Sequence, residues 1–64
     1  MQKITCHTLQ QTVDGEYLVS TTTYDVWINP AHIVSIAPLT FDGAPDIDEI
    51  TMVNNQVFYT LHYR

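Results

Sequence analysis

The side chains best suited to bind a metal ion are one cysteine and three histidines: Cys6, His7, His32 and His62. Cysteine sulfur and imidazole nitrogen are the usual zinc ligands, and a site needs three or four of them to converge. Cys6 and His7 are consecutive in an expected strand, where neighbouring side chains leave on opposite faces. His32 falls in an expected corner, where its ring is better placed to cap a backbone group. We therefore expect no metal site and no cofactor.

Cys6, Ser20 and Ser35 are the candidate nucleophiles, and none of them lies in a strand-to-helix elbow. Cys6 alternates with Ile4 on a face expected to point inward, which favours a buried, inert thiol. The sequence also lacks a glycine-rich loop that would cradle a phosphate. These patterns predict a protein that is not an enzyme and has no catalytic residues.

Three acidic residues near the middle of the chain, Asp46, Asp48 and Glu49, raise the question of an acid pair or a calcium loop. The spacing of an EF-hand is absent. They follow Gly43 and Pro45 in a segment, residues 40–48, that reads as a loop. A solvated acidic loop is the expected structure.

The length and composition predict one small domain covering residues 1–64. The chain is 45% hydrophobic, which is enough to form a core. A domain of this size buries only about 60% of its unfolded surface, and one cysteine allows no internal disulfide. Small chains without a disulfide or metal often gain stability by association, so a homo-oligomer is expected.

The charge is one-sided, with seven acidic and two basic residues and a net charge of −5. Lys3 and Arg64 stand at opposite ends of the sequence, so no basic patch is expected for a phosphate backbone or an anionic membrane. No apolar run approaches the ~20 residues of a transmembrane helix, and the start does not resemble a signal peptide. Together with a free cysteine, these features predict a cytoplasmic protein.

The stretch from Val26 to Leu39 organises the expected fold. Asn29-Pro30 predicts a stiff corner between two strands, because proline fixes its own φ and Asn29 can accept a backbone N–H of a short helical turn. Ile33 and Ile36, three residues apart after the corner, are expected to face the same core as Val26 and Ile28.

The segment before this corner predicts a hairpin of Lys3–Gln10 and Tyr17–Thr23, with its turn at residues 13–16 around Gly15. Whether the second strand continues through Tyr24 into Val26 is open, and a bulge or bend near Asp25 is expected.

The last third predicts a second hairpin, with Asn54-Asn55 as a two-residue primed turn between residues 49–53 and 56–63. The alternation in its last strand indicates two faces. The expected inward residues are Val57, Tyr59 and Leu61, and the expected outward residues are Phe58, Thr60 and His62. The predicted fold class is thus mainly β: a small antiparallel sheet or open barrel of about four to six strands, with two hairpins and one short helical turn near Asn29–His32.

Residues 27–59 resemble the FlbD-like small β proteins linked to bacterial flagella and swarming motility. The matching residues are Ile28, Asn29, Pro30, Ile33, Ile36, Ile50, Asn54 and Tyr59. The resemblance covers about half of the chain and departs from the family pattern in its longer first hairpin, its larger loop at 40–48, and Asn55 in place of a glycine. It implies a short β scaffold and a role linked to motility, and it implies no catalytic residues.

The aromatic residues are more than a domain of this size is expected to bury, and they predict the binding surface. Phe41 lies in the expected polar loop, where it either folds back as a lid on the core or is exposed to contact a partner. The expected partner-binding residues are Trp27, Phe41, Phe58 and Tyr63.

Two functions fit this pattern. The first is a small non-enzymatic interaction or assembly module, homo-oligomeric, that presents a sheet edge or an aromatic face to a protein partner. Accessory proteins of phages and mobile elements are often of this size and acidity. The alternative is a regulator of nucleic-acid machinery, either an acidic DNA mimic or an aromatic single-strand binder. The scarcity of lysine and arginine disfavours direct binding of nucleic acid.

Overall fold

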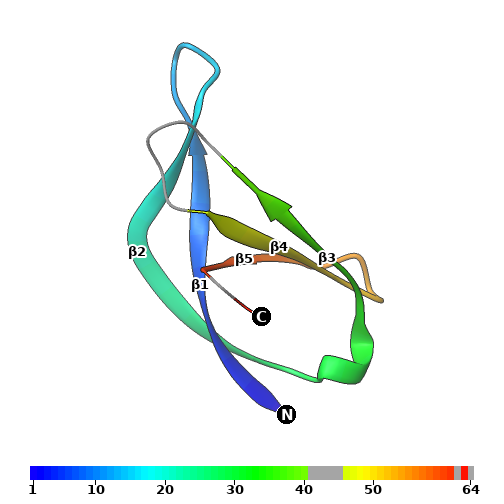
Figure 1. The fold of residues 1–64 in the computed structure, drawn as a ribbon. Coiled ribbons are helices and arrows are strands. Elements are labelled where there is room, and N and C mark those ends of the chain that lie inside the picture. The colour runs from blue at the N-terminus through cyan, green and yellow to red at the C-terminus, as the bar shows by residue number, and fades with distance from the viewer. Residues whose placement is uncertain (41–45, 62, 64) are drawn as a thin grey trace.

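The computed structural model describes residues 1–40, 46–61 and 63, and in this part of the chain five antiparallel strands form one open sheet (Figure 1). The order across the sheet is β2-β1-β5-β4-β3, so β2 and β3 are its edges. The predicted fold class is confirmed. No helix among these residues is long and apolar enough to cross a bilayer. The elements are β1 (Gln2–Gln11), β2 (Tyr17–Ile28), the 3-10 turn η1 (Pro30–His32), β3 (Ile33–Leu39), β4 (Ile47–Met52) and β5 (Val57–Thr60).

The predicted corner joins the two edge strands of the sheet. Asn29 keeps an extended backbone, and its Oδ1 accepts the Ala31 N–H at 3.0 Å. Pro30 begins η1, where the missing N–H would have no helical partner. The His32 carbonyl accepts the Val53 N–H at 2.9 Å, which ties the corner to the turn between β4 and β5. Because this short connection links opposite edges, β2 bends round toward β3 and the sheet is curled (Figure 1).

The β1–β2 hairpin turns at Gly15, as predicted, in a three-residue loop. The Thr12 N–H donates to Glu16 O at 2.7 Å, and the Gly15 N–H donates to Thr12 O at 3.0 Å. Gly15 has φ +83°, a backbone conformation that residues other than glycine and asparagine rarely adopt.

β2 is one continuous strand, and the irregularity predicted near Asp25 is wrong in position. Asp25 pairs regularly with Thr5. The register shifts instead between His7 and Leu9 of β1, whose partners on β2 are Thr23 and Val19. One residue of β1 therefore lies opposite three of β2, residues 20–22, so the irregularity falls in the serine and threonine run and not at Asp25.

The β4–β5 hairpin corrects the predicted turn type. The Met52 N–H donates to Gln56 O at 2.8 Å and the Asn55 N–H donates to Met52 O at 3.0 Å, so the loop holds three residues and not two. Of Asn54 and Asn55, only Asn55 has positive φ, at 69°. A two-residue turn of type I′ requires positive φ at both central residues. A three-residue loop, a type I turn followed by one left-handed residue, requires positive φ only at its last residue.

This turn also reverses the predicted faces of β5. The longer loop pairs Ile50 with Phe58, and directly paired residues of antiparallel strands point to the same face. Ile50 is fully buried, so Phe58 packs against the core and Thr60 is buried, while Val57 is exposed. Val57 and Tyr59 therefore lie on the outer face of β5, and their predicted inward orientation is wrong.

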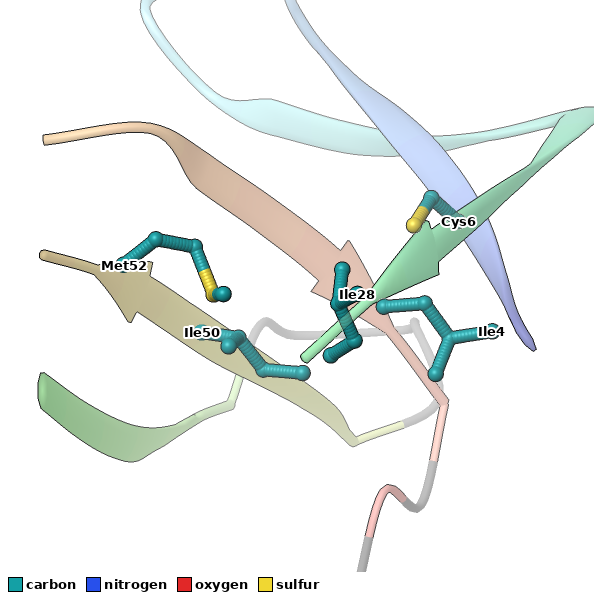
Figure 2. Packing of buried hydrophobic residues seen from close by; sticks show 5 residues of the cluster. All are labelled: Ile4, Cys6, Ile28, Ile50 and Met52. Carbon is teal, nitrogen blue, oxygen red and sulfur yellow. The ribbon is translucent and has the colours of Figure 1, made fainter. Parts of the chain in front are cut away.

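The core lies on the concave side of the curled sheet, and Figure 2 shows its five buried members directed into one space. They come from β1, β2 and β4 and are Ile4, Cys6, Ile28, Ile50 and Met52. Val26, Ile33 and Ile36 pack against this cluster, as predicted.

β1 and β5 join the two halves of the sheet through a narrow seam. In the part of the chain that the structure describes, their ladder has one pair, His7 with Tyr59. Two side-chain hydrogen bonds extend the contact: Thr60 Oγ1 donates to Thr5 O at 2.7 Å, and the Tyr63 hydroxyl donates to Gln2 Oε1 at 2.9 Å.

Candidate interaction site at the corner of the sheet

A groove of about 540 Å³ lies where the end of β2, the corner and the β4–β5 turn meet. We call it the corner groove. Its apolar and aromatic lining is Met1, Tyr24, Val26, Trp27, Ile28, Met52, Val53 and Phe58. Asn29, Asn54 and Gln56 contribute amide groups to its lining. An apolar floor with a few polar groups is the usual composition of a binding site.

The corner groove exists because the end of β2 and the corner that follows it are held beside the distant β4–β5 turn. Trp27 stands between Val26 and Ile28, whose side chains face the core, so strand alternation directs the indole outward. It is 63% exposed. The hydrogen bond from Val53 to His32 brings the β4–β5 turn beside it. Within that turn, Asn54 Oδ1 accepts the Gln56 N–H at 3.1 Å, which fixes the amide groups there.

Two of the four predicted partner-binding residues, Trp27 and Phe58, line this groove. Phe58 is half-buried and also packs against the core. Tyr63 does not line the groove: it packs against the core, and its backbone N–H donates to Asp48 Oδ2 at 2.9 Å. Phe41, predicted as a lid or a partner contact, lies outside the described residues.

Sequence reasoning missed several groove residues. Tyr24 was expected only as one of many surplus aromatic residues, yet it is 46% exposed and lines the groove. Met52 and Val53 carry no local signal for this role, because they lie more than 20 residues after Trp27 in the sequence. They are brought near it by the pairing of Met52 with Ile33 and by the hydrogen bond from Val53 to His32.

The residues with catalytic or metal-binding potential do not gather in the groove. Cys6 is fully buried in the core, and burial, followed by the charge of Asp25, raises the pKa of its thiol. His7 Nδ1 lies 3.0 Å from Ser20 O on the opposite face of β1. Among the described residues no three His, Cys, Asp or Glu side chains come together, and His62 is not one of those residues. His32 is exposed and lines the groove, whereas His7, the other described histidine, does not.

The acidic segment is not wholly a solvated loop, which corrects that expectation. β4 begins at Ile47, so Asp48 and Glu49 are strand residues and are half-buried. The Asp48 carboxylate accepts the backbone N–H of Tyr63 and so has a structural role. Asp46 is exposed and precedes the strand.

Comparisons with protein families, with curated proteins and with solved structures found no match for this chain. The resemblance of residues 27–59 to the FlbD-like proteins therefore stays a prediction.

Proposed function

We propose that this chain is a small, non-enzymatic interaction module that self-associates and binds a protein partner through the corner groove and the adjoining edge of β2. The observation that carries the proposal is the exposed Trp27 beside an apolar groove. Tryptophan and tyrosine are enriched at the energetic centres of protein interfaces.

The exposed aromatic surface gives the proposal a physical driving force. An aromatic side chain buries about 150–250 Å² in an interface, at roughly 25 cal/mol per Å². Covering the exposed part of Trp27 would therefore contribute on the order of 3 kcal/mol before the costs of association. Tyr24 and Met1 extend the same surface, being 46% and 80% exposed.

The two edge strands differ in length and sequence, and β2 is the one better suited to pair with a strand of another chain. β3 has seven residues and carries Pro38, which cannot donate to a further strand. β2 has twelve residues, no proline and one charged residue, Asp25. An unprotected edge of this kind favours the addition of a strand from another chain. A second copy of β2 added in antiparallel orientation would form a closed, two-fold dimer.

The charge distribution supports a protein partner over nucleic acid. The chain has a net charge of −5, and Lys3 lies 4.0 Å from Asp25, which neutralises it locally. Cation-poor surfaces lack the phosphate contacts that dominate nucleic-acid affinity. The buried Cys6 thiol, for its part, supports a role without nucleophilic catalysis.

Sedimentation equilibrium across micromolar to millimolar concentrations tests self-association. We expect a mass above the 7.3 kDa of one chain, falling to that value in Trp27→Gln. The matched control is Val34→Ala on β3, which removes an equally exposed apolar group from the other edge and should leave the mass unchanged. A monomer at every concentration would contradict the dimer.

Fluorescence gives a second readout, because Trp27 is the sole tryptophan. Its emission should shift to shorter wavelength as association covers the indole. A gel-shift series at low salt with single-stranded and duplex DNA separates this function from the nucleic-acid alternative, since we expect no complex.

A further inference from the structure

A second hollow, of about 250 Å³, lies on the outer face of the sheet, away from the corner groove. It is lined by one residue from each strand: Leu9, Tyr17, Leu39, Glu49 and Tyr59. We call it the outer hollow. Glu49 and Tyr59 are directly paired, and the next pair along the same strands is packed into the core. Alternation therefore places the hollow on the opposite side from the core.

The carboxylate of Glu49 is the charged group of the outer hollow. Tyr59 is directly paired with Glu49, and the pKa of Tyr59 is raised by burial and then by the charge of Glu49. The described residues include one lysine, Lys3, and no arginine, and Lys3 is paired with Asp25. Glu49 is thus half-buried without a lysine or arginine partner from this part of the chain, and the imidazole on the neighbouring strands is His7, which pairs with Tyr59.

The surroundings of this carboxylate suit an organic cation. Tyrosine rings present a negative face that attracts ammonium and guanidinium groups. Leucine side chains offer apolar contact to the methylene stem of a lysine or arginine. Ile47, two residues before Glu49 on the same face, is 1% exposed, so this side of β4 is apolar next to the charge. A carboxylate in such a site binds a cation more strongly than it would in open water.

We propose that the outer hollow binds a lysine or arginine side chain from a basic segment of a partner protein, with Glu49 as the counter-charge and Tyr17 and Tyr59 against the stem and head of the cation. Charge complementarity supports this occupant, because the chain carries seven acidic and two basic residues. Among the described residues the outer hollow and the corner groove have no lining residue in common, so this inference does not depend on the proposed function.

The test is an amide NMR titration of the full chain with two probes that differ in the charged head: N-acetyl-lysine methylamide and its uncharged analogue, N-acetyl-norleucine methylamide. We expect saturable shifts centred on Leu9, Glu49 and Tyr59 with the lysine probe, and at least about fivefold weaker binding of the norleucine probe. Trp27→Gln, which damages the corner groove, should bind the lysine probe as the unmodified chain does.

Glu49→Gln removes the counter-charge with little change in shape and should weaken lysine binding about tenfold. Asp14→Asn removes the same charge from an exposed turn and should weaken it less than about twofold. Equal binding of the two probes, shifts centred away from the hollow, or equal effects of the two variants would overturn the proposal. If Glu49→Gln does not fold, the comparison of the two probes on the unmodified chain still decides.

Discussion

Replacing Thr60 with valine tests the seam between the two halves of the sheet. Thr60 is 6% exposed, and its hydroxyl donates to the Thr5 carbonyl at 2.7 Å. Among the described residues the β1–β5 ladder has the single pair His7–Tyr59, so this side-chain bond is a large part of the contact that they make. Valine matches threonine in shape, so Thr60→Val removes the hydrogen bond and leaves the packing almost unchanged.

The expected cost is about 1–2 kcal/mol. A net intramolecular hydrogen bond contributes about 0.5–1.5 kcal/mol, and an acceptor left without a donor adds to the loss. A domain of this length has a total stability of roughly 3–10 kcal/mol, at about 0.05–0.15 kcal/mol per residue. One hydroxyl is therefore expected to account for a substantial fraction of the free energy of unfolding.

Urea denaturation followed by far-ultraviolet circular dichroism measures this cost at a fixed protein concentration. With an m value of about 1 kcal/mol/M, typical of the smallest domains, the midpoint should fall by about 1–2 M. The matched control is Thr51→Val, on the outer face of β4, where the hydroxyl makes no hydrogen bond to a described residue. That change should be neutral or slightly stabilising. An equally neutral Thr60→Val would mean that Thr60 faces solvent, and would refute the pairing of Ile50 with Phe58 that sets the faces of β5.

Three further predictions concern the turns, the corner and the buried ionisable groups. Gly15→Ala should lower the free energy of unfolding, measured with urea, by about 1 kcal/mol. The reason is backbone strain alone, because an added Cβ would meet nothing within 4 Å. Asn55→Ala should lower it by a similar amount, and Asn55→Gly should not. Asn29→Ala should cost about 1 kcal/mol by the same measurement and Asn29→Asp much less, because only the alanine variant loses the cap on Ala31; equal costs would argue against the cap. Burial raises the pKa of the Cys6 thiol above 9.0 in the folded state, so the thiol of the unfolded state loses its proton at a lower pH. The free energy of unfolding should therefore fall above about pH 9. Cys6→Ala should remove the thiol's contribution to this fall when unfolding is measured across that pH range.

Much of the fold could be predicted from local sequence. Asn29-Pro30 constrains its own dihedral angles and supplies its own cap, so the corner forms wherever the strands lie. Gly15 likewise has a positive φ that glycine adopts without strain, and the first turn forms around it. Alternation of Ile4 and Cys6 identified the buried face of β1 because that stretch of strand is regular.

The candidate sites could be predicted only in part. Trp27 was identified because the aromatic residues outnumber what a domain of this size buries, and in the structure its indole is indeed exposed. The outer hollow was missed, because the faces of β5 were exchanged and Tyr59 was expected inside. The pairing of Glu49 with Tyr59 follows from the register, which no single segment reveals.

The amino-acid sequence by itself determined the strands, the corner and the shortage of cations, since each depends on the residues within one short segment. The tertiary structure alone decided which face of β5 is buried and which distant residues share a groove. The physical reason is the two-residue period of a strand: one extra residue in the turn at Val53–Asn55 exchanges its faces. Both arrangements satisfy the local preferences of the turn, and the core selects the one that buries Phe58 and Thr60 beside Ile50.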